Sequence, residues 1–406
     1  MSEGPAAPAA PEGRLLAYVG SYPSDTDPTA GGITALDVSW DGRKITPAHR
    51  IAEPREAGHL AYAESTGTLY AVDERKTDGR GPVQPPAAVH ALSVSRSDGN
   101  LTPVNFRVAP GPRPTYVSVD QRRGLLVTAN HGDFEHVEKV RQAEDGTWQV
   151  EYVYDDSTVL LFGLEADGAV GPLRDVKVME GHGKDPNSSP QAGGHAQSSG
   201  HAHCAVIDPS GDFVLVGDKG TDRILVYRLG DTLELVHTHQ TPPEIAPRHI
   251  AFGPEGDRCY VTYELASEVA SYAFDPETGA LEELSRLSTL PEGYSAPNEP
   301  AEVRVHPNGR FVYVNNRGED TVVAFRAERD GELTRVGHVS LAPSVHPGLA
   351  ARSFAFDPSG TFLLVADRPA DLVRAYTVDS EVGSLTPLTE ARVAQPAFVE
   401  FVVLPG

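Results

Sequence analysis

The feature that most constrains the fold is a hairpin pattern that recurs around a Pro-x-Gly turn. Two apolar runs, within residues 200–207 and 213–219, flank the first such turn, and similar runs flank three later ones. Short apolar runs on both sides of a turn of this kind are typical of β-hairpins. The turn prolines Pro209, Pro254, Pro307 and Pro358 lie 45, 53 and 51 residues apart, which matches the ~40–50 residues of a four-stranded propeller blade.

The whole chain supports this interpretation, because short apolar runs separated by Gly, Pro, Asp and Asn recur throughout and no long segment has helical periodicity. We therefore predict an all-β fold, a seven-bladed β-propeller with four-stranded antiparallel blades. One propeller domain is expected to occupy residues 14–406, after a disordered tail at residues 1–13. The alternative is a pair of separate β-sandwiches, which the repeat disfavours.

Two further segments carry structural predictions. The last apolar run, residues 396–403, belongs to no unit of its own. Because a propeller must close into a ring to remove its open edges, we expect this strand to complete a blade with the N-terminal segment. A charged insertion at residues 132–157 predicts an extended hairpin or excursion, and a second insertion spans residues 182–200.

The charge balance limits the partners. A net charge of −23 argues against nucleic acid or an anionic membrane as partner. The first residues lack a signal peptide's basic start and apolar segment, no apolar run approaches the ~18–20 residues of a membrane span, and two cysteines form no disulfide framework. We predict a cytoplasmic protein, a monomer or weak homodimer, without a cofactor.

Ionisable residues recur at fixed distances from the turns. The tenth residue after the turn position is ionisable in six successive units, and polar residues also stand five or six positions before it, on the first strand. Strand-end loops are often charged simply because they are solvated. However, both sets lie at the same end of a hairpin, so in a ring they would converge on one mouth of the channel. The residues ten positions after the turn are Glu74, His131, Lys219, Glu264, Arg317 and Arg368.

These residue types favour chemistry on a small anion. Arg248 and Arg317 can bind a carboxylate or phosphate, and His203 and Glu264 can act as general acid and base if burial and neighbouring charges tune their pKa toward neutrality. Glu264 and Arg317 could instead form a salt bridge between blades. No nucleophile elbow or nucleotide-binding glycine motif is present. The predicted catalytic residues are His203, Glu264, Arg248 and Arg317, and the predicted substrate-binding residues are His131, Tyr116, His249, Glu302, Arg352 and Lys219.

A metal site is the competing interpretation of one histidine-rich segment. His182, His195, His201 and His203 gather near Cys204 in a Gly- and Ser-rich stretch, and such side chains bind zinc. Their spacing fits no established ligand pattern. We therefore predict no metal.

Five phrases of the sequence carry a family resemblance: His201-Ala202-His203, Pro247-Arg248-His249-Ile250-Ala251-Phe252, Tyr263-Glu264-Leu265, Ala301-Glu302-Val303-Arg304-Val305 and Asn315-Asn316-Arg317-Gly318. They resemble those of the lactonase family of seven-bladed propellers, which includes the propeller-type 6-phosphogluconolactonases and the fungal 3-carboxy-cis,cis-muconate lactonising enzyme. By this resemblance, the conserved His, Arg, Glu and Arg of the family fall on the four predicted catalytic residues. The chain departs from the family at Tyr116, where His is common, and at His131, where Tyr is frequent.

The resemblance implies hydrolysis of a sugar-acid lactone in carbohydrate metabolism, with 6-phosphogluconolactone as the best candidate. Arg248 and Arg317 would hold the anionic group and polarise the ester carbonyl, while Glu264 or His203 activates water. The first alternative is the family's other reaction, cycloisomerisation of a carboxymuconate. The second is a non-catalytic propeller that binds proteins, which would predict exposed aromatic patches at the channel mouth.

Overall fold

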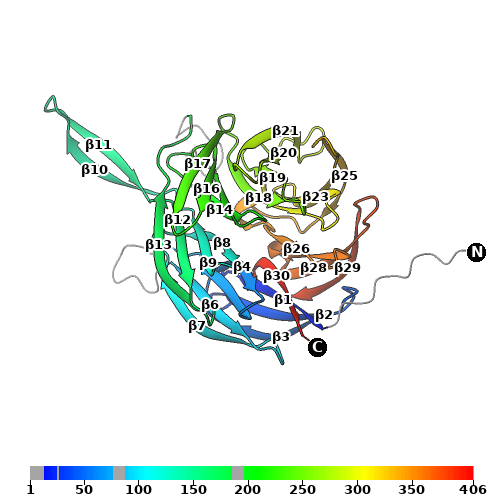
Figure 1. Ribbon diagram of the computed structural model, residues 1–406. Helices are drawn as coiled ribbons and strands as arrows, with labels where there is room; N and C mark the ends of the chain where they lie inside the picture. Colours follow the sequence, from blue (N-terminus) through cyan, green and yellow to red (C-terminus); the bar gives the residue numbers. More distant parts are fainter. Residues whose placement is uncertain (1–12, 25–26, 76–86, 185–195, 406) are drawn as a thin grey trace, which may run out of the picture.

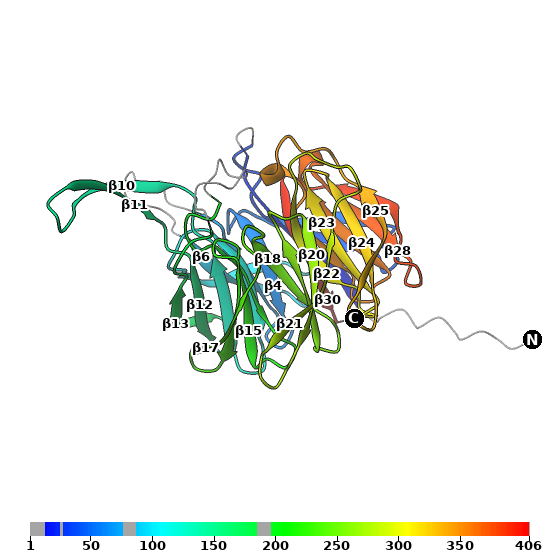
Figure 2. The same ribbon diagram turned by 90° about the horizontal axis from the view of Figure 1, so that it is seen from above.

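The computed structural model describes residues 13–24, 27–75, 87–184 and 196–405. Seven four-stranded antiparallel sheets stand around a central axis and one two-stranded sheet projects from the ring (Figures 1 and 2). The described ranges contain the short 3₁₀ helices η2 (Pro347–Leu349) and η3 (Arg368–Ala370). No helix in the described ranges is long and apolar enough to cross a membrane. The predicted all-β, seven-bladed propeller is confirmed.

The first four blades are each given from the innermost strand outward. Blade 1 contains β30 (Pro396–Leu404), β1 (Arg14–Ser21), β2 (Gly32–Val38) and β3 (Ile45–Ile51). Blade 2 contains β4 (Ala57–Ala63), β5 (Thr68–Asp73), β6 (Ala88–Val94) and β7 (Leu101–Val108). Blade 3 contains β8 (Pro114–Asp120), β9 (Leu125–Asn130), β12 (Thr158–Leu164) and β13 (Val170–Val178). Blade 4 contains β14 (Ala202–Ile207), β15 (Phe213–Asp218), β16 (Arg223–Leu229) and β17 (Leu233–Gln240).

The last three blades follow the chain without interruption. Blade 5 contains β18 (Pro247–Phe252), β19 (Arg258–Tyr263), β20 (Glu268–Phe274) and β21 (Leu281–Ser288). Blade 6 contains β22 (Glu299–Val305), β23 (Phe311–Arg317), β24 (Thr321–Ala327) and β25 (Leu333–Ser340). Blade 7 contains β26 (Phe354–Phe356), β27 (Phe362–Asp367), β28 (Leu372–Val378) and β29 (Leu385–Arg392).

The ring closes where the two ends of the chain meet. Strand β30 pairs antiparallel with β1, from Arg14 opposite Leu404 to Ser21 opposite Pro396, and Figure 1 shows the red β30 beside the blue β1. The C-terminal strand is therefore the innermost strand of a blade whose other strands come from the N-terminal region. This confirms the predicted closure.

The predicted insertions have different outcomes. Residues 132–157 contain the hairpin of β10 (His136–Gln142) and β11 (Trp148–Tyr154), which stands away from the ring (Figure 2) and confirms the expected extended hairpin. Most of the second insertion, residues 185–195, lies outside the described residues. The predicted tail at residues 1–13 also lies outside them, apart from Gly13.

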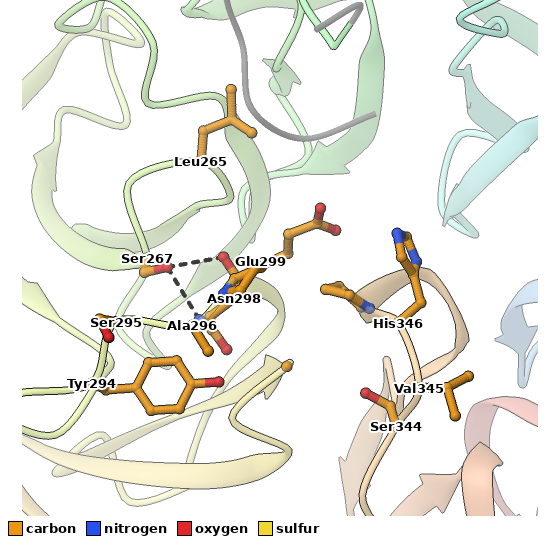
Figure 3. A pocket seen from close by; sticks show the side chains of 13 residues that line it. Leu265, Ser267, Tyr294, Ser295, Ala296, Asn298, Glu299, Ser344, Val345 and His346 are labelled. Atoms are coloured by element: carbon orange, nitrogen blue, oxygen red, sulfur yellow. Dashed lines mark hydrogen bonds between the residues drawn. The ribbon is translucent and has the colours of Figure 1, made fainter. Parts of the chain in front are cut away.

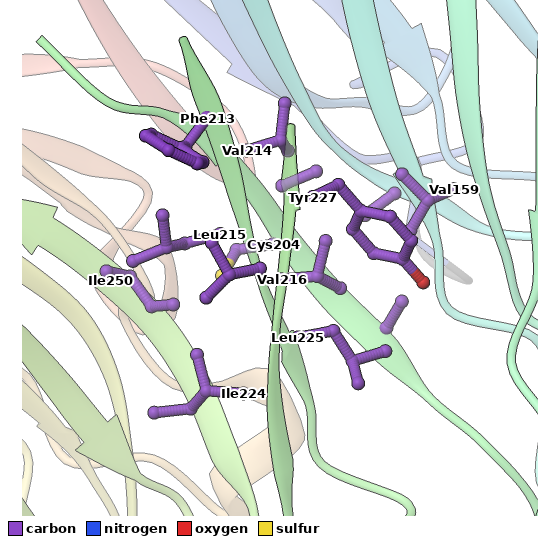
Figure 4. Close-up of a cluster of buried hydrophobic side chains, with 14 of the residues drawn as sticks. Val159, Cys204, Phe213, Val214, Leu215, Val216, Ile224, Leu225, Tyr227 and Ile250 are labelled. Carbon is purple, nitrogen blue, oxygen red and sulfur yellow. The ribbon is translucent and has the colours of Figure 1, made fainter. Parts of the chain in front are cut away.

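Packing between blades explains the near-continuous apolar runs. All six residues of β15 are buried, whereas the outermost strand β17 buries one residue fully. Figure 4 shows the reason: Leu215 faces Ile250 of the next blade, while Val214 and Val216 lie on the side of Val159 in the preceding blade. A middle strand thus has two apolar faces, and each fully buried Val, Leu, Ile or Phe contributes about 1.5–3 kcal/mol.

The repeated turns orient every hairpin in the same way. Gly211, Gly256, Gly309 and Gly360 have φ between +72° and +83°, a region that residues with a Cβ adopt rarely. Each glycine N–H donates to the carbonyl three residues earlier, which closes a tight turn. Because the turns lie at one end, the start of the first strand and the end of the second lie at the other end, toward one mouth of the channel.

Ring closure predicts a sharp contrast between two deletions. Removing residues 396–406 exposes the edge of β1 and opens the ring, so we expect loss of the cooperative thermal transition measured by circular dichroism. Replacing residues 136–154 by a short turn removes a sheet that pairs only with itself, and the transition should stay within a few degrees of the parent. A cooperative transition near the parental temperature in the first variant would contradict the role given to closure.

Candidate active site

A cavity of about 280 Å³ lies at the channel mouth where the hairpins begin and end. Its charged lining combines five basic and four acidic side chains, in a protein whose net charge is strongly negative. Of the ten predicted site residues, seven line it: His131, His203, Lys219, Arg248, Glu264, Arg317 and Arg352. The sequence pattern therefore located the cavity.

Strand ends position these side chains. His131, Lys219 and Glu264 each come directly after the second strand of a blade, and Arg317 is the last residue of β23. Arg368 is the exception in this set. It does not line the cavity, and its Nε donates to Gln395 Oε1 at 2.9 Å.

A β-bulge in the innermost strand aims the remaining side chains. In blades 2 to 6 the register between the first and second strands shifts by one residue, and in β14 the extra residue is His203. In β18 the shift includes Arg248 and His249. Bulges bend a strand and redirect its side chains, and they are common beside active sites. The bulge therefore places His203 and Arg248 on the cavity.

Polar side chains from the second strands support these bulges. Thr262 of β19 accepts a hydrogen bond from His249 N at 3.1 Å and donates to Ala301 O of the next blade at 3.0 Å. Asn315 of β23 likewise donates to Ala351 O of blade 7 at 2.7 Å. The bulged backbone is thus hydrogen-bonded from within and between blades, which keeps its geometry rigid.

Glu264 is the centre of a buried ion cluster. Arg248 Nε lies 2.7 Å from Glu264 Oε2 and Arg317 Nη2 donates to the same oxygen at 2.9 Å. Lys219 Nζ donates to the other carboxylate oxygen. All four side chains are under 10% exposed, and they come from blades 4, 5 and 6. The anticipated salt bridge between Glu264 and Arg317 is therefore present, as part of a larger group that we call the Glu264 cluster.

Burial and the cations of the Glu264 cluster set the protonation states of Glu264 and of His203. Burial alone would raise the pKa of the Glu264 carboxyl, but the three cations, Lys219 foremost, hold this pKa well below its ordinary range. Burial, followed by the charge of Arg248, lowers the pKa of the His203 imidazole well below its ordinary range. The expectation that both groups are tuned toward neutral pH was wrong, because three cations surround the Glu264 carboxylate, while burial and the charge of Arg248 disfavour the protonated form of His203. Glu264 is ionised and His203 neutral at pH 7.

Two buried polar groups on the cavity have unused hydrogen-bonding capacity. Arg248 Nη1 makes no hydrogen bond within the described part of the chain, and Arg248 Nε, although close to Glu264, is not aligned to donate to it. His203 Nδ1 likewise has no partner among the described residues. A buried donor without a partner costs about 1–3 kcal/mol, so these atoms mark a place where a ligand oxygen or water is favoured.

Sequence reasoning missed Arg113 and Asp133 among the lining residues, and it missed Tyr22, which contacts the lining residues Glu74 and Arg352. Arg352 Nη1 donates to Tyr22 Oη at 2.5 Å, and Tyr22 in turn donates to Glu74 Oε2 at 2.5 Å. Arg113 Nε lies 3.2 Å from Asp133 Oδ2. Arg113 directly precedes the first strand of its blade. It therefore lies outside the positions five and six residues before the turn that we compared. Tyr22 follows β1 in the blade where no Pro-x-Gly turn marks the register.

Three predicted substrate-binding residues do not line the cavity. Tyr116, His249 and Glu302 lie in a buried layer of the channel, where His249 Nδ1 is 3.3 Å from Glu302 Oε1 and Arg304 Nε is 3.4 Å from the same oxygen. The rings of Tyr116 and His59 contact each other at a tilt of 37°, with centroids 3.9 Å apart. Tyr116 and His249 directly follow the cavity residues Thr115 and Arg248, so the bulge turns them into the channel interior.

The histidine-rich segment has structural contacts. His201 Nδ1 hydrogen-bonds His131 O at 2.9 Å and the two rings stack at 4.5 Å, while burial raises the pKa of the Cys204 thiol to about 12. Within residues 13–24, 27–75, 87–184 and 196–405, no group of three or more His, Cys, Asp or Glu could hold a metal ion. His195 lies outside those ranges.

Comparison with known proteins finds similarity to lactonases in both sequence and structure. The family model described as "Lactonase, 7-bladed beta-propeller" matches residues 16–401. A 6-phosphogluconolactonase of Bacillus subtilis is 28% identical over 392 residues, which covers 96% of this chain and 98% of that protein. One from Pectobacterium carotovorum is 30% identical over 313 residues, covering 75% and 79%. The solved structure of a periplasmic gluconolactonase of Pseudomonas aeruginosa has a TM-score of 0.79 at 25% identity, covering 97% of this chain and all of that one.

The Glu264 cluster predicts a large stability effect from one isosteric change. Glu264→Gln leaves Lys219, Arg248 and Arg317 buried without their shared carboxylate, so we expect the free energy of unfolding in urea at pH 7 to fall by about 3–5 kcal/mol. As control, Glu151→Gln removes the partner of Arg141 on the exposed hairpin and should change it by less than about 0.5 kcal/mol.

The pH dependence provides a second check. Because the folded-state pKa of Glu264 is lowered, its contribution is fully present above the ordinary glutamate pKa of about 4.3 and declines as pH falls toward the folded value. The difference in the free energy of unfolding between the parent and Glu264→Gln should therefore be constant between pH 5 and 8 and shrink in more acidic solution. Equal stability of the variant and the parent at pH 7 would show that the cluster does not stabilise the fold.

Proposed function

This chain belongs to the lactonase family of seven-bladed β-propellers, and we propose that it hydrolyses a small sugar-acid lactone in the cavity. The observation that carries this proposal is the pair of a neutral His203 and an Arg248 guanidinium with a free Nη1, both on the cavity and both buried. Such a pair supplies a proton acceptor for water and a donor for the oxygen that gains charge in ester hydrolysis.

The cavity suits a single anionic sugar ring. Its volume of about 280 Å³ is of the size of a small-ligand pocket, and its basic side chains outnumber its acidic ones by one in a protein of net charge −23. The names of the Bacillus and Pectobacterium relatives support a phosphorylated lactone. We therefore propose 6-phosphogluconolactone as the first substrate to test, with unphosphorylated gluconolactone beside it.

The chemical step follows from the two polar groups. His203 accepts a proton from water, and the water oxygen attacks the lactone carbonyl carbon. Arg248 Nη1 donates to the carbonyl oxygen as it becomes negatively charged. The tetrahedral intermediate then collapses, the bond from carbonyl carbon to ring oxygen breaks, and His203 returns its proton to that ring oxygen. The product is the open-chain sugar acid.

Glu264 has a different role in this proposal from the one expected. Lys219, Arg248 and Arg317 occupy both carboxylate oxygens of Glu264, so we assign this carboxylate to hold the three cations in place. Arg317 also contacts Glu299, at 2.9 Å between Nη2 and Oε2, which further limits its movement. The cations are thus preorganised before substrate binds.

Cycloisomerisation of a carboxymuconate requires two arginines that can hold a dicarboxylate. Arg317 contacts both Glu264 and Glu299, and the Bacillus and Pectobacterium relatives are named 6-phosphogluconolactonase, so we favour hydrolysis over this alternative. A cytoplasmic location and a monomer or weak homodimer stay predictions. The two buried, free cysteines agree with a reducing compartment.

Mutation of the proposed base gives the main test. His203→Gln removes the proton acceptor and keeps a polar side chain of similar size, so kcat for 6-phosphogluconolactone or gluconolactone should fall by about 10²–10⁴-fold. The exposed His338 on β25 provides the control, and His338→Gln should retain parental kcat. Hydrolysis is followed by acid release, with 3-carboxymuconate assayed in parallel. Parental kcat in His203→Gln, or turnover of the muconate alone, would overturn the proposal.

The low pKa of His203 predicts the pH profile. Burial disfavours its protonation most, and the charges of Arg248, His249, His131 and Lys219 act in the same direction. Because neutral His203 is the active form, kcat/KM should stay constant as pH falls through the ~6.5 of an ordinary imidazole and decline only in more acidic solution. Rates are measured after subtracting the uncatalysed rate at each pH. An acidic limb at or above that value would exclude His203 as the base.

A further inference from the structure

A second hollow adjoins the cavity and is larger, about 710 Å³ against about 280 Å³. We call it the side groove. One wall is the loop before β22, with Tyr294 and Ser295, and the other is the loop before β26, with Ser344 and His346 (Figure 3). Glu299 and His346 line both hollows. A molecule bound in the cavity can therefore extend into the groove.

The side groove is held in shape by hydrogen bonds. Both walls are fastened to the turn between β23 and β24: Glu319 N donates to Asn298 Oδ1 at 3.1 Å, and Ser344 N and Oγ donate to the Asp320 carboxylate at 2.6 and 2.9 Å. Gly318 lies between them with φ +120°, and a Cβ there would approach the backbone of the first wall to 2.2 Å. The groove is therefore preformed, which reduces the entropy lost on binding.

The lining of the groove differs in charge from that of the cavity. It contains no lysine or arginine, and Glu299 is its single acidic residue. Burial, then the charges of Glu319 and Asp320, raises the pKa of the Tyr294 hydroxyl, which reflects acidic surroundings. A phosphate or carboxylate is thus disfavoured in the groove and favoured in the cavity.

Neutral hydrogen-bonding groups and one aromatic ring remain. In the part of the chain that the structure describes, the hydroxyls of Tyr294 and Ser295 make no hydrogen bond, whereas Asn298 is fully used in holding the wall. A half-buried aromatic ring beside free hydroxyls suits a ligand with an apolar face and many hydroxyl groups. A neutral sugar ring has this chemistry.

We propose that the side groove binds a neutral sugar unit attached to the lactone, so that the preferred substrate is the δ-lactone of a disaccharide acid. This inference rests on the proposed lactonase function of the cavity. The lactone ring, with any anionic group, occupies the cavity, while the second sugar lies against Tyr294 between the two loops. Glu299, fixed by Arg317, stands at the junction and can accept hydrogen bonds from sugar hydroxyls.

The test compares glucono-δ-lactone with its 4-O-β-glucosyl derivative. We expect kcat/KM to be at least about tenfold higher for the disaccharide lactone, the equivalent of one well-placed contact. Tyr294→Ala should reduce this ratio to near one, whereas Tyr152→Ala on the distant hairpin should leave the ratio unchanged. Equal or poorer hydrolysis of the disaccharide lactone by the parent protein, or an unchanged ratio in Tyr294→Ala, would overturn the inference.

Calorimetric titration separates the inference from the proposed function. The disaccharide acid and gluconate are titrated into the parent protein and into Tyr294→Ala. Tighter binding of the disaccharide acid by at least about tenfold, lost in the variant, supports the side groove even if neither lactone is hydrolysed. Equal binding of the two acids refutes it, even if gluconolactone is a substrate.

Discussion

Closure of the ring is the constraint on which the rest of the molecule depends. The pairing of β30 with β1 joins the two ends of the chain in one blade and leaves every inner strand facing the channel. Blades then pack face to face, so middle strands such as β15 are buried on both sides. Because all hairpins have the same orientation, their open ends meet at one mouth. The cavity is a consequence of this geometry, since no single blade contains it.

The Glu264 cluster uses the closed ring to concentrate charge. One carboxylate contacts cations from blades 4, 5 and 6, which fixes the blades relative to one another and keeps the cations in place. Charges buried this deeply are costly unless they are paired. His203 is neutral first because it is buried, and then because protonation would add another positive charge beside Arg248.

The two hollows divide recognition by charge. The cavity lining combines five basic with four acidic side chains, while the side groove has hydroxyls, one aromatic ring and no lysine or arginine in its lining. The turn that fastens both groove walls directly follows Arg317, so the charged and neutral regions share one support. A lactone with an anionic end and a neutral end would experience complementary surroundings along its length.

The repeat and its turn chemistry were sufficient to predict the propeller, its closure and the cavity mouth, because strand period and Pro-x-Gly turns are local properties. Fixed offsets also located His203 and Arg248. The sequence did not indicate that a bulge directs these two side chains to the cavity and turns Glu302 into the channel, since a bulge depends on pairing with the next strand. Likewise, the sequence shows which residues are ionisable, but it does not predict their pKa shifts. Those shifts depend on burial and on charges from other blades, which only the assembled ring brings together.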